Sequence, residues 1–148
     1  MLTVKERGTL LYIIEHCKRI EQKITGISLE DFLNNDDLKE IISFNILQIG
    51  ELVKNLSYDF IKQYSKMPWK DIKGMRDWVA HGYNIINLEE IWATATQDIS
   101  PLKEYCEEIL KEDNIEWKRE NYVLSLFFIF SLYFDGVVLI NSLNTLSK

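Results

Sequence analysis

Apolar residues recur at steps of three and four along the chain up to about residue 110, and this spacing is typical of one face of an α-helix. The stretch TLLYIIEHCKRIEQKITG, residues 9–26, carries one such stripe and ends at Gly26, which suits a helix C-terminus. The stretch LKEIISFNILQIGELVKNLS, residues 38–57, carries another and follows NNDD, a polar run that can cap a helix start. The two stripes predict two long amphipathic helices.

Cap and turn residues divide the next part of the chain into shorter helices. Ser28 can start one turn of helix in SLEDFL, and DFIKQYSK forms a further helical piece. That piece must end near Pro68, because proline lacks the backbone N–H and disfavours helix in the residue before it. Pro68 suits the first turn of the next helix, WKDIKGMRDWVAHGY, which should end by Asn84.

The last periodic segment is LEEIWATATQDISPLKEYCEEILK, residues 88–111. Asn87 and Glu90 have the spacing of a capping box at its start, and we expect a kink at Pro101. Only six glycines and two prolines interrupt the whole chain. The pattern therefore predicts an all-α protein, an up-and-down helical bundle with short connections, and we assign this domain to residues 1–115.

An apolar extension follows at residues 116–148. It carries no charge from Tyr122 to Phe134 and a single charge, Asp135, as far as Ile140, which is close to the length of a transmembrane helix. We expect an additional C-terminal helix that packs on the bundle or covers a dimer. A membrane-associated segment and a read-through extension are the alternatives.

Composition supports one globular domain, because 148 residues with 47% hydrophobic content can bury a sizeable core. Cys17 and Cys106 lie on apolar helix faces, which indicates reduced core thiols rather than a disulfide or a metal site. The N-terminal stretch MLTVKERGTLLY has no basic region followed by an uninterrupted apolar run, so we predict no secretory signal and a cytoplasmic location.

The charges are unevenly distributed along the chain. A net charge of −6 argues against a general nucleic-acid binder, since phosphate contacts need Lys and Arg. Residues 98–120 hold eight acidic and four basic residues, whereas residues 60–76 hold five basic residues and one acidic residue, Asp71. The five are Lys62, Lys66, Lys70, Lys73 and Arg76. By composition this basic stretch is either a solvated helix face or the approach to the motif that follows it.

The stretch GMRDWVAHGYN places Arg76, His81 and Tyr83 close together, in a chain with two histidines. On a helix advancing about 100° per residue, with Arg76 at zero, Lys73 falls near 60°, Asp77 near 100°, His81 near 140° and Tyr83 near 340°. The arc from about 200° to 320° holds apolar residues, namely Ile72, Met75, Trp78 and Val79. We therefore predict a core face and a polar face, on which Asp77 can hydrogen bond to His81 and orient its imidazole.

This set of side chains suits cleavage of RNA without a metal ion or another cofactor. An imidazole can transfer a proton at neutral pH, and a guanidinium offers a fork of donors that matches a phosphate. In such cleavage the ribose 2′-OH attacks its own phosphate. Acid–base cleavage uses two proton-transfer groups, so a two-fold dimer that pairs two copies of this helix would complete the site. An ordinary polar helix face is the alternative.

The octet RDWVAHGY also resembles the signature of the HEPN superfamily, and of HepT-like toxins in particular, which is Arg, four residues, His, one residue and Tyr. LQIGELVKNLS is similar to that family's second-helix motif, and LEEIWATATQDISPLK to the segment after the signature. The similarity covers roughly residues 5–111. Asp77 stands where the family usually has asparagine.

The resemblance implies a toxin that cleaves RNA without a metal ion and works as a dimer with its Arg and His at the subunit interface. Arg76 would then stabilise phosphate charge, and His81 would be the acid–base group. The resemblance further implies a partner, a nucleotidyltransferase antitoxin of the MNT type that transfers AMP to Tyr83. We expect RNA as the substrate, either tRNA or mRNA.

Other readings of these residues stay open. The chain could be a non-catalytic helical subunit that binds a nucleotidyltransferase, which its overall acidity favours, or a purely structural bundle. We expect His16 to be a boundary residue rather than a catalytic one. The helical spacing of Trp69, Trp78 and Trp92 favours core packing over base stacking.

Overall fold

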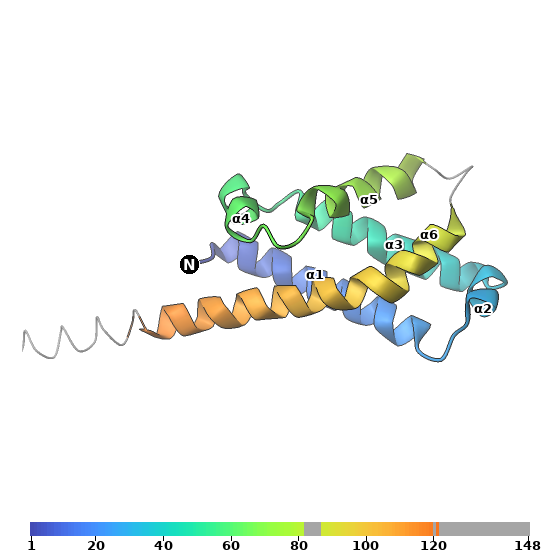
Figure 1. The fold of residues 1–148 in the computed structure, drawn as a ribbon, viewed down its shortest axis with the longest axis horizontal. Helices are drawn as coiled ribbons and strands as arrows, with labels where there is room; N and C mark the ends of the chain where they lie inside the picture. Colours follow the sequence, from blue (N-terminus) through green and yellow to red (C-terminus); the bar gives the residue numbers. More distant parts are fainter. Residues whose placement is uncertain (82–86, 120, 122–148) are drawn as a thin grey trace, which may run out of the picture. The chain divides into compact units, whose positions relative to one another are not determined.

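The computed structural model describes residues 1–81, 87–119 and 121, and of residues 76–81 it describes the backbone only. The described ranges are helical and contain no strand, which confirms the predicted all-α class (Figure 1). The elements are α1 (Val4–Ile24), α2 (Leu29–Leu33), α3 (Asp36–Val53), α4 (Tyr58–Gln63), α5 (Trp69–His81), α6 (Leu88–Ala93) and the π-helical turn η1 (Thr94–Asp98). Residues 99–119 are also helical.

Side-chain caps define most of the helix starts. Ser28 caps α2 and forms a reciprocal capping box with Asp31, as its position suggested. The side chain of Asn35 accepts a hydrogen bond from the backbone N–H of Leu38, so the NNDD run caps α3 as predicted. Asn87 caps α6 by accepting from two backbone N–H groups of the first turn. The helix boundaries thus follow from short-range chemistry.

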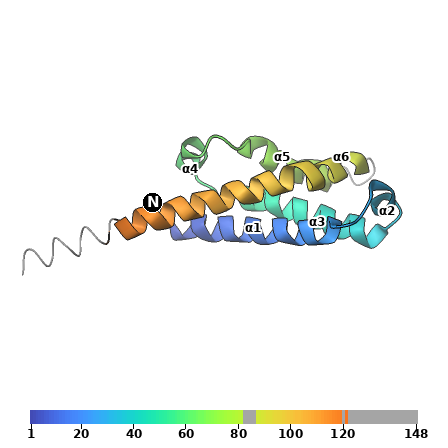
Figure 2. The ribbon, with the colours of Figure 1, turned by 60° about the horizontal axis from the view of Figure 1, so that its bottom comes forward.

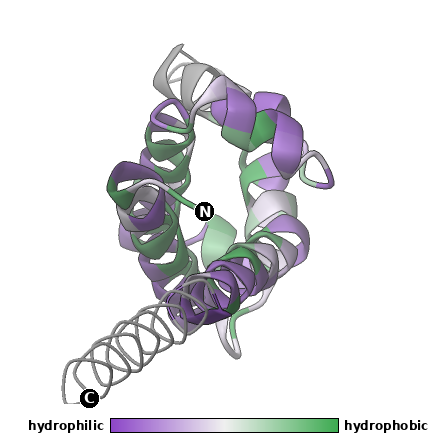
Figure 3. Cartoon of the chain, turned by 90° about the vertical axis from the view of Figure 1, so that its left-hand side faces the viewer, coloured by the Kyte–Doolittle hydropathy of each residue, from purple (hydrophilic) through white to green (hydrophobic). Residues whose placement is uncertain are grey.

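Residues 2–111 form one compact unit. Within it, α3 packs against both α1 and α5 and runs between them in Figure 1. The start of the helix at residues 99–119 lies along α1 in Figure 2. Hydrophilic and hydrophobic residues both occur along the coloured helices in Figure 3, as expected for amphipathic helices around a shared core.

The core consists mainly of branched aliphatic side chains contributed by α1, α3 and the segment from α6 onward. Its fully buried members include Leu10, Ile13, Ile20, Ile42, Ile46, Ile49, Ile91, Ile99 and Ile109. Cys17 and Cys106 are free thiols that belong to this core, as predicted. Burial raises the pKa of the Cys17 thiol to about 12 and also raises the pKa of Cys106, so both stay protonated at neutral pH.

The chain is helical through Pro101, and a π-helical turn, η1, ends three residues before it, while the kink expected at Pro101 stays a prediction. The N–H of Ile99 bonds to the carbonyl of Thr94, five residues back instead of four. Proline cannot donate to the carbonyl four residues before it, and its ring crowds that carbonyl.

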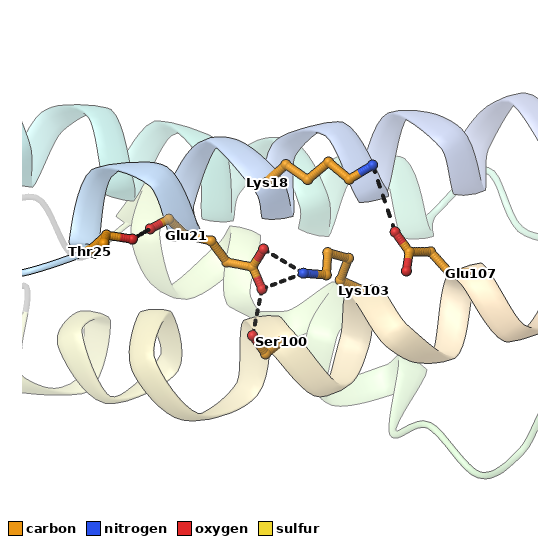
Figure 4. A network of polar contacts seen from close by, with 6 residues as sticks. All are labelled: Lys18, Glu21, Thr25, Ser100, Lys103 and Glu107. Carbon is orange, nitrogen blue, oxygen red and sulfur yellow. Dashed lines mark hydrogen bonds and ion pairs between the residues drawn. The ribbon is translucent and has the colours of Figure 1, made fainter.

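An ion-pair network joins α1 to the helix at residues 99–119 (Figure 4). Lys103 binds both carboxylate oxygens of Glu21, and the hydroxyl of Ser100 donates to the same carboxylate. A second pair, between Lys18 and Glu107, spans 3.7 Å. These polar contacts fix how residues 99–111 lie on α1.

Within the described ranges no helix is long and apolar enough to cross a membrane. The apolar run from Tyr122 to Phe134, and the helix predicted for it, lie outside the described residues. The division into residues 1–115 and 116–148 therefore stays a prediction.

Candidate functional site

Helix α5 carries the motif, and its first turn is fixed by contacts with the core. Trp69 is 2% exposed and Ile72 is 4% exposed. The indole Nε1 of Trp69 donates to the carbonyl of Tyr64 at 2.8 Å, and its ring lies 5.6 Å from that of Phe60. Pro68 stands just before the helix and accepts from the N–H of Ile72 at 3.1 Å. Core packing and hydrogen bonds from Trp69 and Ile72 therefore hold the start of α5.

The predicted site residues are placed only in part. Arg76, Asp77 and His81 lie on α5, as the spacing predicted, but their side chains are outside the described ones. Lys73 is on the same helix, and its side chain is exposed. Tyr83 follows the end of α5 by two residues and lies outside the described residues. The structure thus places four of the five residues on one helix.

The buried sector of α5 is wider than the apolar arc expected from the sequence. With Arg76 at zero, Ile72 lies near 320° and Trp69 near 20°, so the sector reaches past the predicted limit of about 320°. The Arg76 position falls between these two buried residues on the wheel, whereas the His81 position is about 140° away. The Cα atoms of residues 76 and 81 therefore lie on different sides of α5.

The exposed sector of α5 holds the lysines. Lys70 lies near 120° and Lys73 near 60°, and both are exposed. Gly74, near 160°, is also exposed, and a Cβ atom built there would meet nothing within 4 Å. The His81 position, near 140°, belongs to this sector. One side of the helix therefore combines positive charge with open space.

His16, the other histidine, is half-buried, in keeping with the expected boundary position. Its Nδ1 lies 2.8 Å from Oδ1 of Asn45, which is 4% exposed. The amide nitrogen of Asn45 donates to the carbonyl of Ile41 at 2.7 Å, so its oxygen must accept from His16. This contact holds the proton of His16 on Nδ1 and joins α1 to α3.

Asn45 was missed by the sequence analysis. It stands on α3 between the buried residues Ile42 and Ile49, and the available signal was a single polar residue within an apolar stripe. Buried polar groups of this kind are nearly always hydrogen bonded, so a partner could have been expected, but not which one.

Two of the three tryptophans assigned to the core are confirmed there. Trp69 is buried, and Trp92 packs against the core with its ring 5.2 Å from that of Phe32. The side chain of Trp78 lies outside the described ones. In the described part of the chain, no group of three or more His, Cys, Asp or Glu side chains is arranged to hold a metal ion.

Comparison with known proteins gives a consistent result. Residues 13–109 match the family model described as Ribonuclease HepT-like. The chain is 37% identical over 107 residues to the protein named "Putative RNase TTE0752" of Caldanaerobacter subterraneus subsp. tengcongensis, a match that covers 72% of this chain and 96% of that protein. It is 31% identical over 99 residues to the "Probable ribonuclease HepT" of Thermococcus cleftensis, covering 67% of this chain and 90% of that protein. No solved structure shows significant similarity to the chain.

Proposed function

The chain belongs to the ribonuclease HepT-like family, and from this premise we propose that it is a metal-independent ribonuclease that acts as the toxin of a toxin–antitoxin pair. The observation that carries the proposal is the placement of Arg76 and His81 on one helix, five residues apart, within the matched region. The names of the relatives, which describe RNases, support it.

Each motif residue has a role in the proposed reaction. His81 takes the proton from a ribose 2′-OH, whose oxygen forms a bond to the adjacent phosphorus. The bond from phosphorus to the 5′ oxygen breaks, and that oxygen receives a proton from a second acid. The products are a 2′,3′-cyclic phosphate and a free 5′-hydroxyl group. Arg76 stabilises the negative charge that gathers on the phosphate oxygens.

Lys73 and Asp77 support this chemistry. Lys73 adds positive charge on the exposed sector of α5. Asp77 precedes His81 by four residues, the spacing at which two helical side chains can meet, and so can orient the imidazole.

We further propose that the active species is a homodimer. The Arg76 and His81 positions lie about 140° apart around α5, so they start from different sides of one helix. Two copies of α5 related by a two-fold axis would bring the Arg76 of one chain near the His81 of the other. The same axis supplies the second proton-transfer group, which one chain lacks in its motif.

Cleavage in the presence of EDTA tests the nuclease. Purified protein is incubated with RNA and EDTA beside the His81→Ala variant, and the variant's helical circular dichroism spectrum is compared with that of the wild type. We expect the wild type to cut RNA and the folded variant to lose that activity. A folded His81→Ala variant with full activity would disprove the role of His81.

The proposed control of the toxin is transfer of AMP to Tyr83 by a nucleotidyltransferase antitoxin. The tyrosine oxygen attacks the α-phosphorus of ATP, its proton is lost to solvent, and pyrophosphate leaves. The product carries an added negative charge two residues after His81, where it would compete with RNA phosphate for Arg76. Intact-mass spectrometry after incubation with a candidate partner and ATP would detect it, and Tyr83→Phe should abolish both the mass increment and the inhibition.

The net charge of −6 favours a second candidate function, a helical subunit that binds a nucleotidyltransferase without cutting RNA. The two candidates differ in the EDTA assay. A wild-type protein that forms a complex with the nucleotidyltransferase but leaves RNA intact would support the binding subunit.

A further inference from the structure

Four exposed lysines follow one another from α4 into α5. Lys62 is on α4, Lys66 is in the connection, and Lys70 and Lys73 are on the first turns of α5. We call these four residues the lysine track. In the part of the chain that the structure describes, none of the four forms an ion pair with a carboxylate. Lys66 places its ammonium 6.0 Å from the ring centroid of Tyr105, which is a neutral partner.

Other lysines of the chain contrast with the track. Lys18, Lys39 and Lys54 each have a carboxylate partner, at 3.7, 2.6 and 2.9 Å respectively. The carboxylate of an ion pair offsets the positive potential of the ammonium, so the pair attracts a further anion less than an unpaired lysine does. The track instead concentrates four positive charges in a chain whose net charge is −6, and such a region attracts a polyanion.

The geometry of α5 directs the track toward the motif. Lys73, Lys70 and the His81 position lie near 60°, 120° and 140°, so they share one sector of the helix. Gly74 lies near 160° and adds no side chain to this sector, which also contains the Asp77 position, near 100°. Asp71, the acidic residue among the lysines, lies near 220°, about 100° from Lys70.

We propose that the lysine track binds the sugar–phosphate backbone of single-stranded RNA and guides it along α5 to His81. The inference rests on the proposed ribonuclease function and adds the surface that holds the substrate. Binding through phosphates alone carries no base preference. Sequence preference in cleavage, if the protein has one, would then come from groups outside the track.

Salt dependence of binding tests the proposal. In the His81→Ala background, which prevents cleavage, a fluorescein-labelled single-stranded RNA of mixed sequence is titrated at several KCl concentrations and followed by fluorescence anisotropy. The test variant is Lys62→Gln/Lys70→Gln/Lys73→Gln. The matched control is Lys18→Gln/Lys39→Gln/Lys54→Gln, which removes the same number of positive charges from lysines that have carboxylate partners.

Each phosphate contact contributes about 0.7 to the slope of log K against log salt for a single strand. We therefore expect the test variant to lose about 2 from this slope and the control to keep the parent slope. Equal slopes in the parent and the test variant would contradict the proposal that the lysine track binds RNA. Absence of RNA binding by the parent would contradict it as well. The binding assay does not depend on cleavage. If the test variant loses the slope and the wild type proves unable to cut RNA, the lysine track is supported and the nuclease proposal fails.

Discussion

The ammonium of Lys103 lies 2.7 Å from Oε1 and 2.6 Å from Oε2 of Glu21, which joins α1 to a helix 82 residues further along the chain (Figure 4). Ser100 donates its hydroxyl to Oε1 of the same carboxylate at 2.5 Å. The two charged side chains are only 20% and 25% exposed. The contact therefore combines charge, hydrogen bonding and partial burial, and its removal should have a measurable effect.

Replacing Lys103 by methionine keeps most of the aliphatic side chain and removes the ammonium. The carboxylate of Glu21 is then left partly buried without its main partner, so we expect the free energy of unfolding to fall by about 1–3 kcal/mol. Denaturation with urea measures the change. Lys18→Met is the matched control, because Lys18 and Glu107 are each about half exposed and 3.7 Å apart, and it should cost less than about 1 kcal/mol. Equal losses in the two variants would contradict this ranking.

Stability should decrease in acid through Glu21. Burial by itself would raise the pKa of Glu21, but hydrogen bonds from Lys103 and Ser100 outweigh it, and the pKa lies below the ordinary value of 4.5. The folded protein then binds this proton less tightly than the unfolded chain. The contribution of Glu21 is therefore fully present above pH 4.5 and is lost as the pH falls through the lower pKa of the folded state.

The comparison of wild type with Glu21→Gln isolates this contribution. Urea midpoints of the two proteins, measured from neutral pH downward, should converge in acid. Parallel curves would show that Glu21 does not carry the effect. Glu6 should give a similar but separate loss, since hydrogen bonds from Ser57 and Thr3 outweigh burial and lower its pKa as well.

Two glycine-to-alanine substitutions should have opposite effects on stability. Gly74 lies inside α5, and an added Cβ would meet nothing within 4 Å, so Gly74→Ala should stabilise the protein by about 0.5–1 kcal/mol. Gly26 has φ of +75° after the end of α1, where alanine is strained, so Gly26→Ala should destabilise it by about 1–2 kcal/mol. Thermal denaturation of both variants measures the signs. A loss of stability in Gly74→Ala would reveal a close contact at this exposed position.

The parts of the fold that depend on neighbouring residues could be predicted from the sequence. Ser28 and Asn87 cap their helices as expected, because a cap involves only the next three residues. Contacts across the fold could not be predicted in this way. Spacing along α1 and α3 does not reveal that His16 meets Asn45, since that contact depends on the register in which the two helices pack.

The same distinction applies to the candidate site. The helix that carries Arg76 and His81 was predictable, because its period is local. The burial of Trp69 was also expected from its helical spacing. Its contacts with Phe60 and Tyr105 were not, because those two residues come from other parts of the chain and no pattern within α5 indicates them.

The last prediction concerns the guanidinium of Arg76. Lysine in its place keeps the positive charge but replaces a planar fork of donors by a single ammonium, which cannot hold two phosphate oxygens in the same geometry. If Arg76 stabilises charge on the phosphate during cleavage, Arg76→Lys should reduce kcat/KM about 10- to 100-fold, the equivalent of one charged hydrogen bond. Initial rates of RNA cleavage in EDTA measure the change, with circular dichroism to confirm that the variant is folded. Arg19→Lys is the matched control, because Arg19 is an exposed arginine of α1 that pairs with Glu15 at 3.3 Å, and this variant should keep the wild-type rate. Wild-type rates in both variants would mean that a point charge at position 76 is enough, and the bidentate role of Arg76 would have to be abandoned.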